Sequence, residues 1–280
     1  MKNILLPTDF SDNAWNAIKY ALHFFENEAC NFYLLHVNRL TTITDGNSTY
    51  VPTPEEIETY YIKPAKNQLK EILKKIAVEL PDNKNHRFYT LTDYNFFIES
   101  IRKHVADKKI DYIVMGTKGA TGAKEVIIGT NTGDVIRKVQ CKTLIVPENA
   151  NFTQIKEIAF PTDFSLSYSI QTLNPLHKIM RDHHSSMRIL HVTENREDMN
   201  DNQLENKGLI EDFFAELSYS FHYLTNSKIE DAIQCFVESR DINLIVMVAK
   251  NLNYFQQILF HPRIEKISYH VDVPFLVLHE

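Results

Sequence analysis

The chain has 280 residues, of which 44% are hydrophobic and 24% are charged, and its formal net charge is −6. This length allows two domains of ordinary size, each able to bury its own core. The negative charge argues against nucleic-acid binding, which needs clustered positive charge, and no apolar run is long enough for a transmembrane helix. Three widely spaced cysteines and a start without a signal peptide predict a cytoplasmic protein with reduced thiols.

The first half of the chain alternates short apolar segments with longer amphipathic ones. Helical spacing of apolar residues covers 13–25, 54–80 and 96–106, with helix starts at Ser11 and Thr53. The predicted strands span residues 2–7, 32–37, 86–91, 111–116 and 143–147. Strands that alternate with helices predict a parallel sheet covered on both faces, with a ligand crevice at the carboxyl ends of the strands.

A long polar segment, residues 38–53, follows the second predicted strand. Connections of this length are typically functional or disordered. We expect this one to be a mobile cover over the crevice, with plain disorder as the alternative.

Five of the seven glycines lie between Gly116 and Gly133, directly after a predicted strand. Glycine lets backbone amides approach a ligand, and the unpaired N–H groups of a helix that starts after Gly129 suit a phosphate. The stretch therefore predicts a phosphate-binding loop, with a simple tight turn as the alternative. A Walker loop is excluded because Thr130, not lysine, follows Gly129, and the dinucleotide fingerprint belongs after the first strand of a domain.

The two halves of the chain repeat each other. Pro-Thr-Asp-Phe-Ser occurs at residues 7–11 and again at 161–165, and Leu-His-Val, Ile-Val-Met and a final apolar strand recur in the same order. A duplicated domain explains this pattern. We predict one domain over residues 1–148 and a second over residues 155–280.

The first half resembles the universal stress protein family, whose nucleotide-binding members carry Gly, two residues, Gly, nine residues, and Gly followed by Ser or Thr. Gly116, Gly119 and Gly129-Thr130 match this spacing, and the strand-end aspartate and the Leu-His-Val element agree as well. Together with the repeat, the resemblance implies a tandem member of the family. The implied fold is two doubly wound α/β domains of the adenine nucleotide α-hydrolase-like type, each with a five-stranded, mainly parallel sheet and helices on both faces.

The resemblance also implies a set of binding residues. Asp9 would lie by the adenosine moiety beside Pro7 and Thr8, and Val37 would contact adenine through its backbone. The ribose and the phosphates would be held by Met115, Gly116, Gly119, Gly129, Thr130 and Asn131. The implied ligand is ATP, or AMP or ADP in its place, with or without Mg²⁺.

The second half departs from this pattern. Counted from the shared Ile-Val-Met, the positions of Gly116, Gly119, Gly122, Gly129 and Thr130 are taken by Val248, Asn251, Tyr254, His261 and Pro262. Two aromatic residues would crowd a phosphate there, and a proline removes one amide. We therefore expect only the first domain to bind nucleotide and the second to be structural or regulatory.

The resemblance implies a stress-response or signalling regulator whose nucleotide occupancy changes its conformation or its binding to a protein partner. No arranged general base or metal cluster is evident, so no catalytic residue is assigned, and ATP hydrolysis or autophosphorylation would be slow at most. One alternative is a nucleotide-independent interaction module. The other, an ATP enzyme of the pyrophosphatase type, would need a Ser-Gly-Gly loop where the chain has Pro-Thr-Asp-Phe-Ser.

Assembly is expected to follow from the duplication. The last strands of the two halves, residues 143–146 and 274–278, would pair antiparallel about a pseudo-two-fold axis and so cover each other's edges. This internal pseudo-dimer is compatible with a monomer and with a further homodimer.

Overall fold

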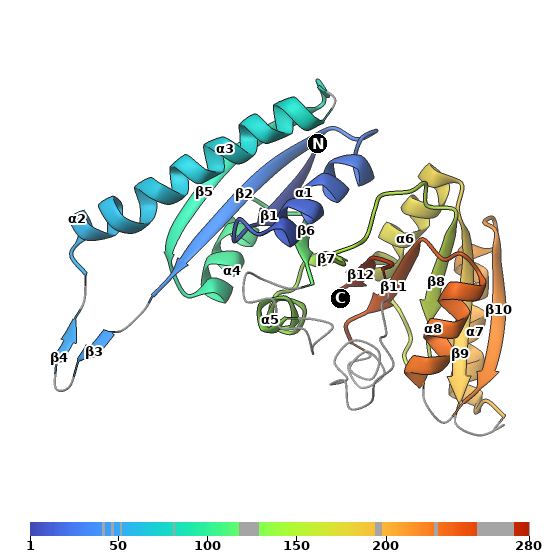
Figure 1. The fold of residues 1–280 in the computed structure, drawn as a ribbon. Coiled ribbons are helices and arrows are strands. Elements are labelled where there is room, and N and C mark those ends of the chain that lie inside the picture. The colour runs from blue at the N-terminus through green and yellow to red at the C-terminus, as the bar shows by residue number, and fades with distance from the viewer. Residues whose placement is uncertain are drawn as a thin grey trace.

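The computed structural model of the chain describes all residues except 41–42, 46–47, 51, 81, 118–128, 194–197, 227–228, 251–271 and 280. A ten-stranded sheet runs through the whole molecule, and helices cover both of its faces (Figure 1). The predicted α/β class is confirmed.

The elements of the first half follow the predicted alternation of strands and helices. Its strands are β1 (Lys2–Pro7), β2 (Cys30–Arg39), β3 (Ile43–Asp45), β4 (Ser48–Tyr50), β5 (His86–Asn95), β6 (Tyr112–Gly116) and β7 (Lys142–Val146). Its helices are α1 (Asp12–Phe24), α2 (Pro54–Ile57), α3 (Lys63–Glu79), α4 (Phe97–Asp107) and α5 (Thr130–Lys138), with a π-helical turn, Glu58–Ile62, joining α2 to α3.

The second half repeats this alternation. Its strands are β8 (Glu157–Pro161), β9 (Ser186–Thr193), β10 (Tyr219–Thr225), β11 (Leu244–Val248) and β12 (Phe275–Leu278). Its helices are α6 (Ile170–His183), α7 (Asp201–Phe214) and α8 (Ile229–Ser239).

The order of the strands in the large sheet reads the same from either edge. It is β10-β9-β8-β11-β12-β7-β6-β1-β2-β5, so β1 lies between β2 and β6 just as β8 lies between β9 and β11. Within each half the neighbouring strands are parallel, and the halves meet where β7 and β12 pair antiparallel, with Leu144 opposite Leu276. The predicted pairing of the last strands is confirmed. Strand order reverses at β1, which puts a crevice at its carboxyl end.

Side chains of β1 alternate between two layers of core, as the pleat of a strand requires. Ile4 and Leu6 belong to the cluster that includes side chains of α1 and α3, whereas Leu5 packs with Ile101 of α4 and Val135 of α5. The first of these clusters continues into the second half, so one hydrophobic core spans the junction.

Further contacts tie the first half to the second half and to the connection, residues 147–156, between β7 and β8. Asn16 donates a hydrogen bond to the carbonyl of Ala150 at 2.9 Å. The carboxylate of Glu28 accepts hydrogen bonds from Lys2 and, across the junction, from Lys178 of α6, both at 2.6 Å. Burial alone would raise the pKa of Glu28, but the hydrogen bonds from the two lysines outweigh it and hold that pKa below its usual value.

The segment predicted to cover the crevice, residues 38–53, contains further strand structure. Its first two residues, Asn38 and Arg39, extend β2, because β2 keeps its register with β5 as far as the pair Arg39 and Asn95. β3 and β4 then form a two-stranded antiparallel hairpin, which projects beyond the end of β2 in Figure 1. A covering role for this segment stays a prediction.

Candidate functional site

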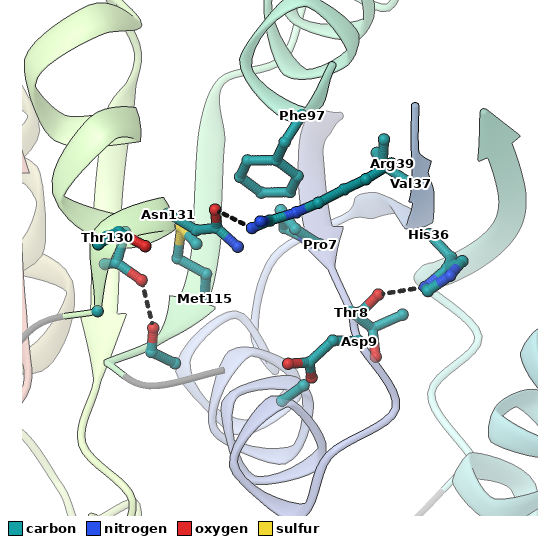
Figure 2. A pocket seen from close by; sticks show the side chains of 14 residues that line it. Pro7, Thr8, Asp9, His36, Val37, Arg39, Phe97, Met115, Thr130 and Asn131 are labelled. Atoms are coloured by element: carbon teal, nitrogen blue, oxygen red, sulfur yellow. Dashed lines mark hydrogen bonds between the residues drawn. The ribbon is translucent and has the colours of Figure 1, made fainter. Parts of the chain in front are cut away.

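One pocket at the carboxyl ends of β1, β2 and β6 brings together nine of the ten predicted site residues (Figure 2). Its volume is about 320 Å³, near the lower end of the range for small-molecule sites, roughly 300–1,000 Å³. The predicted residues that line it are Pro7, Thr8, Asp9, Val37, Met115, Gly116, Gly129, Thr130 and Asn131. The tenth, Gly119, lies outside the described residues, and the binding role of the set stays a prediction.

The Pro-Thr-Asp-Phe-Ser sequence forms the turn between β1 and α1. Phe10 has a φ of 67°, in the left-handed region that bulky residues rarely adopt. Two side chains hold this conformation: Thr8 Oγ1 accepts from the backbone N–H of Phe10 at 3.0 Å, and Asp9 Oδ1 accepts from the N–H and hydroxyl of Ser11. Ser11 Oγ in turn caps α1 by accepting from the N–H of Ala14 at 3.2 Å.

The same turn recurs at the start of the second half. Phe164 has a φ of 55°, and Thr162 and Asp163 accept the equivalent hydrogen bonds from Phe164 and Ser165. The repeated motif therefore has a local structural function in both halves, whatever Asp9 contacts in a ligand.

A histidine fastens each turn to the neighbouring strand. His36 Nδ1 lies 2.8 Å from the carbonyl oxygen of Thr8, and the His36 ring stacks on Phe10 with a centroid distance of 4.4 Å. Since a carbonyl only accepts, Nδ1 carries a hydrogen and donates it to Thr8. His191 makes the same contact with Thr162 at 2.9 Å. This geometry gives both histidines a structural function, although His36 also lines the pocket.

Gly116 is required by the close approach of α1 to the end of β6. A Cβ atom on Gly116 would lie 2.7 Å from Nδ2 of Asn13, in the first turn of α1, and a real Cβ essentially never approaches another atom that closely. The carbonyl of Gly116 accepts a hydrogen bond from Thr132 Oγ1 at 2.8 Å, which fixes the start of α5 against β6. Gly116 thus serves packing and places α5 at the pocket.

Two helices begin at the pocket without a side-chain cap. The N-cap residues of α4 and α5 are Phe96 and Gly129, and neither supplies a side-chain acceptor to the first turn. By contrast, α1, α6 and α7 are capped by Ser11, Ser169 and Asn200. The first amides of α5 therefore receive no side-chain acceptor from their N-cap residue, and they lie beside the pocket, where the helix dipole favours negative charge.

Sequence reasoning missed two prominent residues of the pocket, Arg39 and Phe97. The Arg39 side chain crosses the pocket below Phe97, and its Nη2 donates to Oδ1 of Asn131 at 2.6 Å (Figure 2). Strand alternation carried a signal, because Arg39 lies two residues after Val37 and so on the same face of β2. For Phe97 the signal was that α4 begins at the carboxyl edge of the sheet.

The corresponding turn in the second half is bound to other parts of its own half. Gln203 and Asn206 of α7 donate hydrogen bonds to the carbonyls of Asp163 and Phe164, both at 2.8 Å. In addition, the hydroxyl of Tyr168 lies 3.2 Å from Thr162 Oγ1.

Val248, the residue at the position of Gly116, is buried at the end of β11. Helix α6 follows the turn after β8 and begins at Ile170. Relative to the preceding strand, α6 begins one helical turn later than α1 does. The other substituted positions, Asn251, Tyr254, His261 and Pro262, lie outside the described residues.

In the described part of the chain, no helix is long and apolar enough to cross a membrane. No group of three or more His, Cys, Asp or Glu side chains among these residues is placed to hold a metal ion.

Comparisons of sequence and of structure with known proteins agree on one family. The model of the universal stress protein family matches residues 1–147. The universal stress proteins MJ0577 of Methanocaldococcus jannaschii and YxiE of Bacillus subtilis are each 28% identical to the chain; the matches cover 52% and 51% of the chain and 94% and 97% of the relatives. The structure of a universal stress protein from Archaeoglobus fulgidus matches 98% of this chain and 97% of its own, with 20% identity and a TM-score of 0.66. The similarity in fold therefore includes both halves.

Proposed function

Because this chain belongs to the universal stress protein family, we propose that its first half, residues 1–148, binds one adenine nucleotide in the pocket at the ends of β1, β2 and β6. The observation that carries the proposal is the uncapped start of α5 at Gly129, which lies in the same pocket as Asp9 and Gly116. An uncapped helix start offers N–H donors and a positive dipole end to a phosphate.

The residues of the pocket divide into two groups in this proposal. The first amides of α5, with the hydroxyl of Thr130, hold the phosphates, whereas Pro7 and Asp9 lie by the adenosine and the backbone of Val37 contacts the adenine. ATP is the proposed ligand, with AMP and ADP as weaker candidates because they place fewer charges at α5. Mg²⁺ would bind through the phosphates, as Asp9 already accepts two hydrogen bonds from Ser11.

The second half, residues 155–280, is proposed to be a structural or regulatory domain without a nucleotide. Its turn after β8 is engaged by Gln203 and Asn206, and Val248 occupies the position of the strand-end glycine. These contacts favour a closed crevice over a second binding site.

We propose a regulatory role in the cytoplasm, in which nucleotide occupancy alters a surface that a protein partner recognises. Helix α1 supports this role, because it begins at the turn that contains Asp9 and ends near the second half. At that end, the ring centroids of Phe24 and His183 are 5.9 Å apart. Glu28, which lies shortly after the helix, accepts a hydrogen bond from Lys178. A change in the first turn of α1 would thus reach the junction of the halves.

The test is a thermal unfolding series on the purified full chain, stripped of carried-over nucleotide. Adenosine, AMP, ADP and ATP are each added with Mg²⁺, and GTP serves as the control for the base. A ligand present at a hundred times its Kd stabilises the folded state by about 2.7 kcal/mol. ATP should therefore raise Tm by several degrees and GTP should not. No shift with any adenine compound would favour the nucleotide-independent interaction module.

A further inference from the structure

Among the described residues that line the pocket, Arg39 is the one lysine or arginine. It lies at the last position of β2, and its guanidinium reaches over the carboxyl end of β1 to the first turn of α5 (Figure 2). There it donates to the side-chain oxygen of Asn131 at 2.6 Å. A positive charge is thereby held beside the uncapped amides of α5.

The acceptor in this contact is a neutral amide. A guanidinium binds a phosphate more strongly, because the acceptor is charged and the planar fork can donate two parallel hydrogen bonds. A phosphate held by the amides of Thr130 and Asn131 would lie next to the position that the guanidinium already occupies. Arg39 is exposed, so a small movement of its side chain would exchange the Asn131 oxygen for a phosphate oxygen.

We infer that Arg39 is a phosphate-recognition residue of this site: it releases Asn131 and binds a phosphate oxygen of the nucleotide. This inference rests on the proposed function and adds to it a residue that discriminates by phosphate number. Affinity should then rise from adenosine through AMP to ATP, and Arg39 should account for a large part of the rise.

The test compares Arg39→Gln with the wild-type chain by calorimetric titration of adenosine and of ATP. Loss of one charge-assisted contact should weaken ATP binding about tenfold or more, and adenosine binding should change by less than about twofold. Arg39→Lys keeps the positive charge but loses the planar guanidinium fork. Its ATP affinity should therefore lie between those of the wild-type chain and Arg39→Gln. Arg87→Gln is the matched control, since Arg87 is an exposed arginine at the opposite end of the neighbouring strand β5.

The outcomes separate this inference from the proposed function. Wild-type chain that binds neither compound would overturn both. Wild-type chain that binds ATP, with Arg39→Gln binding it equally well, would overturn the inference alone. Equal weakening of adenosine and ATP would also overturn it, because Arg39 would then support the shape of the pocket and not contact phosphate. Retention of the unfolding midpoint in Arg39→Gln confirms that the variant is folded.

Discussion

Replacing Gly129 by aspartate is expected to weaken ATP binding about a hundredfold or more while leaving the chain at least as stable as before. Gly129 has extended backbone angles, φ −65° and ψ 158°, which any residue adopts. An aspartate at this N-cap position would accept hydrogen bonds from the first amides of α5, the same donors that the proposed phosphate needs. Hydrogen bonds to a charged group are worth about 1.5–3 kcal/mol each, so loss of two lowers affinity about a hundredfold or more.

The carboxylate also lies at the positive end of α5, which stabilises the helix by about 0.3–1 kcal/mol. Calorimetric titration and thermal unfolding should thus show opposite effects, weaker binding and an equal or higher Tm. Gly129→Ser is the matched variant, since serine caps the helix without adding charge. Its loss of ATP affinity should be smaller than that of the aspartate. Full ATP affinity in Gly129→Asp would rule out the start of α5 as the phosphate site.

Replacing Gly116 by alanine is expected to destabilise the folded chain by about 1–3 kcal/mol, the usual cost of overpacking. The new methyl group would lie 2.7 Å from the side chain of Asn13, which is buried in the first turn of α1. Displacement of Asn13 would disturb the adjoining turn, so ATP affinity should fall as well. Urea unfolding at equilibrium measures the first effect, and titration measures the second.

Gly208→Ala is the control for this prediction. Gly208 lies within α7, and a Cβ atom there meets nothing within 4 Å. Alanine should therefore stabilise the chain by roughly 0.5–1 kcal/mol through helix propensity alone. In addition, the double variant Asn13→Ala/Gly116→Ala should recover part of the loss, because the clash is removed. Unchanged stability in Gly116→Ala would contradict the packing argument.

Much of the fold could be predicted because its signals are local. Apolar runs such as residues 2–7 and 111–116 are buried strands, and the repeated Pro-Thr-Asp-Phe-Ser places both strand-to-helix turns. The extent of β2 and β5 was underestimated. Their last residues are polar, and they are strand residues only because each pairs with the other, from His36 opposite Thr92 to Arg39 opposite Asn95.

The site was predicted less completely, for a related reason. Glycine spacing and the family resemblance identified backbone-binding positions, which depend on local conformation. Arg39 and Phe97 enter the pocket from β2 and α4, and their position depends on strand order and on the length of β2. Strand alternation puts Arg39 on the same face as Val37, but no local pattern gives the strand order that brings both residues to α5. Likewise, the hairpin of β3 and β4 arose from a segment whose composition indicated only a polar connection.

The stoichiometry of ATP binding to the full chain tests the central claim most directly. Nucleotide-stripped protein is titrated with ATP and Mg²⁺ in a calorimeter, beside the Gly129→Asp variant at the same concentration. One ATP per wild-type chain is expected, with binding about a hundredfold or more weaker in the variant. Two ATP per chain would contradict the assignment of the second half as a domain without nucleotide, and no binding would contradict the nucleotide function itself.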